Sequence, residues 1–155
     1  MTAAPGACLI CELEHAAPAA VVFRDDLWAA EIVAGFDVPG WFFLRTRRHA
    51  ERLTGLDDAE LGSLGRRARD LVAAVTDVTG APATYLFVFG ENYPHFHAVI
   101  TARGEHVPEN RRSGDILKLR AGHTDPVAAA RLVPLVRAAY HRISGAAAPG
   151  EVAPQ

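Results

Sequence analysis

The feature that most constrains the fold is one well-marked amphipathic helix with strand-like segments on both sides of it. Asp57 can cap its first turn, and Glu60, three residues later, completes a capping box. Apolar residues then recur at the spacing of one helical face: Leu61, Leu64, Ala68, Leu71, Val72 and Val75. Gly80 can end the helix in the left-handed conformation. The pattern therefore predicts one long helix that buries a single face.

Several other segments have the composition of strands, and they lie before and after this helix in the chain. They are residues 20–24, 28–33, 41–47, 84–90 and 95–103. The acidic pair at residues 25–26 suits a hairpin turn between the first two. Strands, a helix, more strands and a final helix predict an α+β fold. We expect an antiparallel sheet of about five strands with one main helix and a C-terminal helix.

The rest of the chain gives weaker signals. For residues 104–124 we expect a long loop with one short strand at residues 116–119. Asp125 and Pro126 can start the last helix, since Asp suits the cap and Pro the first turn. The expected division of the chain is a flexible N-terminus at residues 1–7, a domain at residues 8–144 and a flexible tail at residues 145–155.

Composition excludes several classes of protein. The chain has 155 residues, 50% of them hydrophobic, and a formal net charge of −2. This length suits one domain with a substantial core, and the composition argues against disorder of the whole chain. No basic stripe dominates, so we expect no nucleic-acid partner.

The N-terminal stretch MTAAPGACLICELEH does not have the pattern of a signal peptide. It lacks a basic segment, and Glu12 and Glu14 interrupt its apolar run. No run of about 18 apolar residues predicts a membrane span. We therefore expect a cytoplasmic protein without a membrane partner, in a reducing compartment.

The only two cysteines, Cys8 and Cys11, form a C-x-x-C motif. In a reducing compartment this spacing indicates a metal or redox site before a structural disulfide, although two ordinary buried thiols also fit it. A redox pair would need a thioredoxin-like helix start, which the sequence does not show. Zinc prefers four ligands in a tetrahedron, so a zinc site needs two more side chains.

The segment PHFHAVITAR offers two histidines as further ligands or as catalytic groups. His95 and His97 would face the same side of a strand, because alternate side chains share a face. Taken alone, such a pair is more often an ordinary surface or core feature. His15 and His49 are further candidates for the metal, and spacing alone does not choose between them.

Together these pieces resemble the histidine triad superfamily over about residues 8–103. The matching stretches occur in order: CLICELE, VVFRDDLWAAEI, VPGWFFLRTRRHAERLTGLDDAEL and GENYPHFHAVITAR. The family signature is His-φ-His-φ-His, with a glycine five residues before the first histidine and often a closing arginine. Gly90, His95, His97 and Arg103 stand at these positions, and Val99 stands where the third histidine would be.

The resemblance implies a role for most of these residues. Zinc-containing members, and the related galactose-1-phosphate uridylyltransferases, hold the metal with residues that match Cys8, Cys11, His49 and His95. One structural Zn²⁺ per chain is therefore implied, with His49 chosen over His15. The second histidine, matched by His97, is the family's nucleophile. It attacks an α-phosphorus and forms a nucleotidyl-histidine that water or another acceptor resolves, a role that suits a neutral imidazole.

Two positions depart from the family pattern, and both affect phosphate binding. Val99 replaces the third histidine with a side chain that neither donates nor accepts a hydrogen bond. Trp41 replaces the histidine of a Pro-Gly-His motif, and it is either a core aromatic or a stacking surface for a substrate. Loss of one good donor typically removes about 2.7–4 kcal/mol of transition-state stabilisation.

Other substrate contacts follow more loosely. Glu31 could bind a ribose or be solvated, and Glu91 and Asn92 could face the phosphates or be ordinary turn residues. Three functions stay open: a nucleotidyl hydrolase or transferase acting through His97, a catalytically impaired zinc-stapled nucleotide-binding or regulatory module, and an enzyme repurposed for another substrate. The expected partner is a small nucleotide-like molecule, and the resemblance also implies a homodimer.

Overall fold

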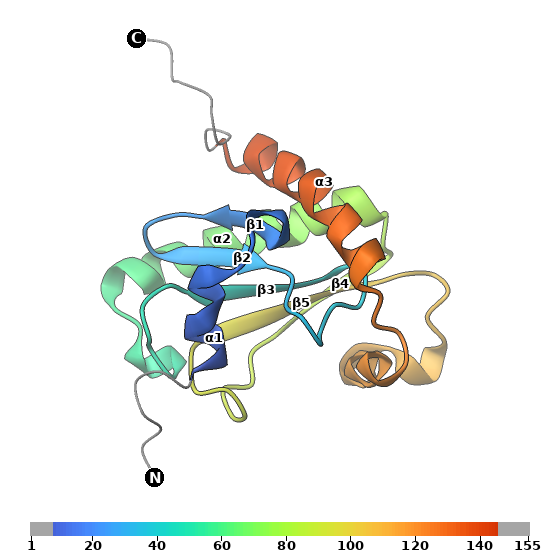
Figure 1. Cartoon of the computed structure of the whole chain (residues 1–155), viewed down its shortest axis with the longest axis horizontal. Coiled ribbons are helices and arrows are strands. Elements are labelled where there is room, and N and C mark those ends of the chain that lie inside the picture. Colours follow the sequence, from blue (N-terminus) through green and yellow to red (C-terminus); the bar gives the residue numbers. More distant parts are fainter. Residues whose placement is uncertain (1–7, 146–155) are drawn as a thin grey trace.

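The computed structural model describes residues 8–145, and its centre is an antiparallel sheet (Figure 1). Within these residues the five strands are β1 (Val21–Arg24), β2 (Trp28–Glu31), β3 (Trp41–Thr46), β4 (Ala83–Phe87) and β5 (His97–Arg103). Their order across the sheet is β1-β2-β3-β5-β4, with every neighbouring pair antiparallel. The predicted α+β class and five-stranded antiparallel sheet are confirmed. The last strand, predicted from residue 95, begins two residues later.

Helices occupy most of the remaining described chain. The α-helices are α1 (Leu9–Glu12), α2 (Asp58–Thr79) and α3 (Pro126–Ser144). The 3-10 helices are η1 (Leu13–His15), η2 (Pro18–Ala20), η3 (Leu53–Gly55), η4 (Glu109–Arg111) and η5 (Ser113–Ala121). The main helix and the C-terminal helix that the sequence predicts correspond to α2 and α3.

The ends of α2 are those that the sequence predicts. The carboxylate of Asp57 accepts a hydrogen bond from the Glu60 backbone N–H at 2.8 Å. The Glu60 carboxylate accepts one in return from the Asp57 N–H at 2.9 Å, which completes the capping box. Gly80 follows the last turn at φ 63°, a conformation that glycine adopts without strain.

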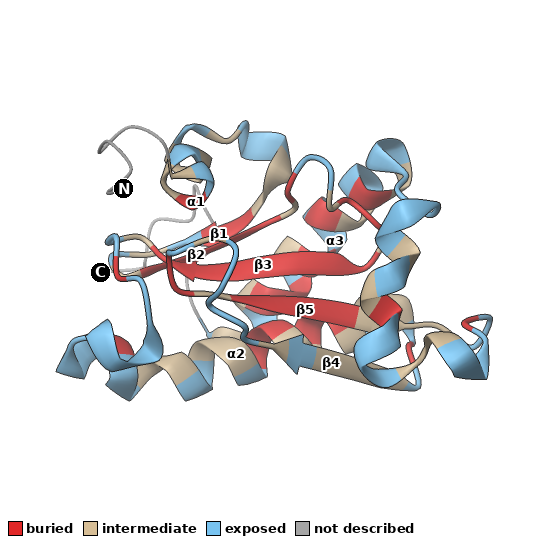
Figure 2. Cartoon of the chain, turned by 90° about the horizontal axis from the view of Figure 1, so that it is seen from below, coloured by how far each residue is buried: buried red, intermediate tan, exposed pale blue. Residues whose placement is uncertain are grey.

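The two faces of the sheet have different coverings, because alternate residues of a strand point to opposite sides. On one face, β3 and β5 contribute the fully buried residues Phe42, Leu44, Ala98 and Ile100. These pack with apolar residues of α2 and α3 in the main core. Figure 2 shows β3 and β5 buried along most of their length.

The opposite face carries the residues that matter for function, and we call it the α1 face. Phe43 and Val99 lie on it and pack with Ile10 of α1. Further along the same face, Trp41 packs with Ile116 of η5. The predicted site residues of β3 and β5 therefore lie away from the main core.

The prediction of a short strand at residues 116–119 is wrong, because these residues belong to η5. Ile116 is fully buried against Trp41, whereas Asp115 and Lys118 form an ion pair at 2.6 Å on the exposed side. Residues three apart stand above one another in a 3-10 helix, so this pairing suits a helix and not a strand.

The ends of the chain lie outside the described residues. The segments predicted to be flexible are residues 1–7 and 145–155, of which the structure describes only Gly145. The division into these ends and a domain at residues 8–144 stays a prediction. Within residues 8–145, no helix is long and apolar enough to cross a membrane.

Candidate metal centre and histidine site

Four side chains that could hold a metal ion meet at one end of the sheet. Cys8, Cys11, His49 and His95 each offer one ligand atom, and these atoms all lie within 4.8 Å of one another. The cysteines belong to α1 and its N-cap, His49 follows β3, and His95 precedes β5. Among the described residues, His15 is not part of this cluster. The structure thus brings together the same four residues that the resemblance selects.

Local structure explains how the C-x-x-C segment presents both sulfur atoms. Cys8 is the N-cap of α1, and its Sγ accepts a hydrogen bond from the Cys11 backbone N–H at 3.4 Å. One helical turn therefore places both thiols on the same side. Ile10, between them, is fully buried beside Phe43 and Val99. This burial anchors α1 to the sheet.

The separations within the cluster suit a tetrahedral ion. The Cys11 Sγ lies 3.3 Å from His49 Nδ1 and 3.4 Å from His95 Nδ1, and Cys8 Sγ lies 3.6 Å from His95 Nδ1. With zinc–sulfur bonds of about 2.3 Å and zinc–nitrogen bonds of about 2.0–2.1 Å, neighbouring ligand atoms are roughly 3.3–3.8 Å apart. The donor set of two thiols and two imidazoles is also one that zinc prefers.

The contacts of His95 determine which of its nitrogens can bind a metal. Its Nε2 lies 2.7 Å from the Thr46 carbonyl oxygen, which can only accept. The proton therefore resides on Nε2, and Nδ1 presents its lone pair to the two thiols. Such a hydrogen bond from the second ring nitrogen is typical of metal-binding histidines.

Burial also shifts the acidity of these groups. It lowers the pKa of His95, which keeps the imidazole neutral and able to bind a metal. Burial, together with the neighbouring Cys8, raises the pKa of the Cys11 thiol to about 11. A metal that binds here must displace that proton, so its affinity will depend on pH.

His97, two residues further along, is outside the cluster but connected to it. Its Nδ1 lies 2.6 Å from the backbone oxygen of His95. Because a carbonyl oxygen only accepts, Nδ1 carries the proton and Nε2 keeps the lone pair. One carbonyl group therefore links a member of the metal cluster to His97.

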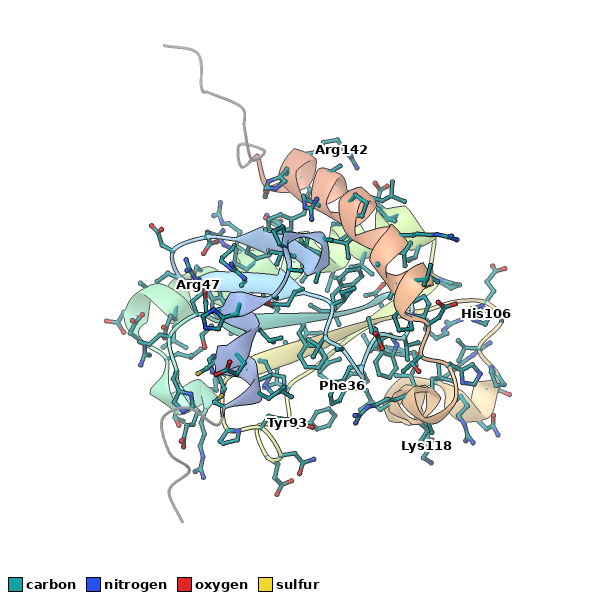
Figure 3. All side chains as sticks on the ribbon, viewed as in Figure 1. Phe36, Arg47, Tyr93, His106, Lys118 and Arg142 are labelled. Carbon is teal, nitrogen blue, oxygen red and sulfur yellow. The ribbon has the colours of Figure 1, made fainter. Side chains whose placement is uncertain are left out.

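Aromatic rings surround His97, which is half-buried on the α1 face. Its ring is stacked on Phe43 with centroids 5.5 Å apart, and the Tyr93 ring meets it at 6.3 Å. Phe36 contacts both Phe43 and Tyr93, at 5.4 and 6.0 Å. Figure 3 shows Phe36 and Tyr93 close together. We call Phe36, Phe43, Tyr93 and His97 the aromatic cluster.

The two positions that depart from the family pattern are both apolar and buried. Val99 is 8% exposed and Trp41 only 2% exposed. In the register of β3 and β5, Phe43 pairs with Val99. Val99 is two residues from His97 along β5, and Phe43 is two residues from Trp41 along β3. Trp41 also lines a groove of about 520 Å³, at the opposite end of β3 from the metal cluster. Of the two predicted roles for Trp41, its packing is therefore that of a core aromatic residue.

The sequence leaves open whether Glu31 is a solvated residue, and this interpretation is wrong. It is fully buried, and its Oε1 accepts hydrogen bonds from Arg45 Nε at 3.1 Å and Nη2 at 2.9 Å. Burial raises the pKa of Glu31, while the charge of Arg45 opposes the rise. Arg45 also donates to Glu14 at 2.9 Å, which ties the segment after α1 to the sheet. Glu91 and Asn92 lie exposed in the turn between β4 and β5.

Sequence reasoning missed several members of this site. It did not assign Phe36 or Tyr93 to the surroundings of His97, and it gave Arg45 no role. A signal for Arg45 is present, since a charged residue within the apolar strand WFFLRTR is rarely buried without a partner. Phe36 and Tyr93 lie in connecting segments, where aromatic residues follow no period.

Comparisons with known proteins give a match in structure. No protein-family model matches the sequence, and no curated protein matches it. A hypothetical histidine triad nucleotide-binding protein from Sulfolobus tokodaii has a TM-score of 0.70 at 16% identity, covering 94% of this chain and 100% of that one. A Zn-bound histidine triad family protein from Mycobacterium smegmatis has a TM-score of 0.64 at 18% identity, covering 91% and 98%.

The third match is a uridylyltransferase with a TM-score of 0.65 at 20% identity, covering 89% of this chain and 46% of that one. This chain has the histidine triad fold. At these identities the likeness shows the fold alone. Within the histidine triad fold, the chain combines a cluster that could bind a metal with an incomplete triad motif, His95-Phe96-His97-Ala98-Val99.

Proposed function

We propose that the chain is a nucleotidyl hydrolase or transferase of the histidine triad type, with His97 as its nucleophile. The observation that carries this proposal is the 2.6 Å contact between His97 Nδ1 and the His95 carbonyl oxygen. It leaves Nε2 as the unprotonated nitrogen, which an attacking imidazole requires. The description of the Sulfolobus protein as nucleotide-binding supports the substrate class.

The reaction would proceed in two displacements at the α-phosphorus. In the first, His97 Nε2 forms a bond to phosphorus while the bond to the leaving group breaks, and that group takes the electron pair and a proton from solvent. The Nδ1–H bond to the His95 carbonyl stabilises the positive charge that the ring gains. In the second, water or another acceptor attacks phosphorus and loses a proton, and the electrons of the phosphorus–nitrogen bond return to Nε2.

We also propose that Cys8, Cys11, His49 and His95 hold one structural Zn²⁺. The ligand separations and the Zn-bound description of the Mycobacterium smegmatis protein support this choice of metal. Four protein ligands leave no position for substrate, so the ion would stabilise α1 and the segment that carries His95. Both cysteines are free thiols, which suits the reducing cytoplasm that we propose as its compartment.

Among the expected substrate contacts, exposure favours the turn residues. Glu91 and Asn92 are exposed just before His95, and we retain them as contacts for the phosphates or the leaving group. Val99, Trp41 and Glu31 are buried, so they would shape the floor of the site without binding phosphate directly. The homodimer implied by the resemblance remains part of this proposal.

A catalytically impaired nucleotide-binding module is the second candidate. The apolar Val99 beside His97 favours it, since the family's phosphate-contacting histidine is absent at that position. The two candidates differ in whether a bond to His97 forms.

The test compares wild type, His97→Ala and the matched control His123→Ala, which changes an exposed histidine. Each protein is assayed on a fluorogenic adenosine phosphoramidate, and its intact mass is measured after rapid acid quench. The proposal predicts weak turnover and an adenylyl adduct in wild type and in His123→Ala, with both lost in His97→Ala. Turnover that survives His97→Ala would refute the nucleophile. Binding of the nucleotide with no adduct and no turnover in wild type would favour the impaired module.

A further inference from the structure

Arg120 contacts the aromatic cluster from a distant part of the chain. It belongs to η5, and its guanidinium carbon lies 3.5 Å from the centroid of the Phe36 ring. Its Nε donates a hydrogen bond to the Gly35 carbonyl oxygen at 2.7 Å. Together these two contacts hold the guanidinium over the ring, in the arrangement of a cation–π pair.

No carboxylate in the described part of the chain neutralises Arg120. Within residues 8–145 it forms no ion pair, and its only hydrogen bond uses Nε. The Nη donors of this exposed side chain are therefore available to a ligand. Arg45, the cross-strand neighbour of His97, differs in both respects, since it is fully buried and bound by Glu31 and Glu14.

The aromatic cluster lies between the charge of Arg120 and His97. Phe36, under Arg120, contacts Phe43 at 5.4 Å, and Phe43 is stacked on His97 at 5.5 Å. Tyr93 provides a second link from Phe36 to His97. Arg120 and His97 therefore border the same aromatic cluster, with Phe36 and Phe43 between them. A guanidinium in this position would meet an anionic group of the substrate other than the one that His97 would attack.

We propose that Arg120 is a specificity-determining residue that binds a second phosphate of the substrate, beyond the phosphorus that His97 attacks. The proposal rests on the nucleotidyl function given above. It names the substrate class as nucleoside diphosphates, polyphosphates or their esters, in preference to simple monophosphate derivatives. A guanidinium is suited to this role because it binds phosphate with charge-assisted, bidentate hydrogen bonds.

Binding measurements test this role independently of turnover. The zinc-loaded full chain is titrated with AMP, ADP and inorganic pyrophosphate by calorimetry, as wild type, Arg120→Gln and Arg120→Lys. Glutamine removes the charge but keeps a donor for Gly35, and lysine keeps the charge but loses the fork. Arg66→Gln is the matched control, since it removes an exposed charge on α2. Melting temperatures establish that each variant is folded.

We expect wild type to bind ADP more tightly than AMP. Arg120→Gln should weaken ADP binding about tenfold, the loss of one charge-assisted contact, and change AMP binding less than about twofold. Arg120→Lys should lie between wild type and Arg120→Gln, and Arg66→Gln should match wild type. In turnover assays the same loss should appear in KM for a dinucleoside polyphosphate and not in KM for the phosphoramidate.

The outcomes separate this proposal from the one on which it rests. Equal weakening of AMP and ADP in Arg120→Gln, or no weakening of either, overturns the role of Arg120 and leaves the nucleotidyl function standing. Pyrophosphate binding that depends on Arg120, without binding of either nucleotide, supports the anion site and overturns the nucleotide substrate. Wild type that binds none of the three probes overturns both.

Discussion

The α1 face holds two histidine environments that differ sharply although the residues are two apart in sequence. His95 lies among sulfur and nitrogen ligand atoms, and its second ring nitrogen is held by the Thr46 carbonyl oxygen. Among residues 8–145, the one side-chain hydrogen bond of His97 is to the His95 carbonyl oxygen, and its ring contacts Phe43 and Tyr93. The hydrogen bonds that orient both imidazole rings are present, whereas Val99 and Trp41 place apolar side chains where the family pattern has histidines. In the proposed enzyme, orientation of the nucleophile would therefore be separable from binding of its phosphate.

Removing a ligand from the His95 environment should have the largest effect. Cys8→Ser is expected to abolish most zinc binding and to lower the melting temperature by about 10 °C, because structural zinc contributes directly to folding. Elemental analysis and thermal unfolding of protein purified without chelator measure both quantities. His15→Ala is the control and should keep its metal. Full metal content in Cys8→Ser would contradict the four-ligand assignment.

Breaking the buried ion pair beside both environments should come next. Arg45→Met leaves Glu31 buried without its partner and is expected to lower the free energy of unfolding by about 3–5 kcal/mol. The double variant Arg45→Met/Glu31→Leu removes both charges and should recover much of that loss. Urea unfolding measures each value. If the double variant is less stable than Arg45→Met alone, the pair is not the source of the effect.

Adding a donor to the His97 environment should sharpen the comparison. Val99→His places an imidazole on the same face of β5 as His97, two residues away. This substitution is expected to raise kcat on the phosphoramidate by up to about 100-fold. Val99→Leu, which adds volume without a donor, should not raise it. A rate for Val99→His no higher than for Val99→Leu would show that phosphate contacts lie elsewhere.

The parts that the sequence predicts are those specified by local patterns. The capping box at Asp57 and Glu60 marks the start of α2 and Gly80 marks its end, so each end could be identified from a local pattern alone. The four metal-cluster residues come from three separate segments, and only the resemblance joined them. Once joined, their proximity is confirmed by the structure.

The parts that the sequence does not predict depend on contacts between distant segments. The hydrogen bond from Arg120 to Gly35 spans 85 positions, and no periodic pattern encodes it. From the sequence alone, Glu31 could be either solvated or functional. Its burial depends on its contact with Arg45 in the neighbouring strand, which a local pattern does not show. The 3-10 helix η5 forms where Ile116 covers Trp41, a packing contact that short polar segments do not reveal.

Acid should remove the stability that the ion pairs of Glu14 provide, and this should be the smallest of the predicted effects. Burial alone would raise the pKa of Glu14, but hydrogen bonds from Arg47 and Arg45 outweigh it and lower the pKa to about 2. A carboxylate with a lowered folded-state pKa stabilises the protein above its unfolded value, and this contribution is lost as pH falls from about 4.5 toward 2. Between pH 5 and pH 3, wild type should therefore lose up to about 1 kcal/mol more stability than Glu14→Gln. Equal losses in the two proteins would remove Glu14 from the account.

The tautomer of His97 tests most directly the claim that the metal-cluster segment orients the nucleophile. Nitrogen-15 chemical shifts of the histidine rings in the zinc-loaded protein, near neutral pH, report which nitrogen of each ring carries the proton. The contact with the His95 carbonyl predicts a protonated Nδ1 and a bare Nε2 for His97, with the proton of His95 on Nε2. A His97 ring protonated on Nε2 would contradict the account, because no lone pair would then be directed toward a substrate.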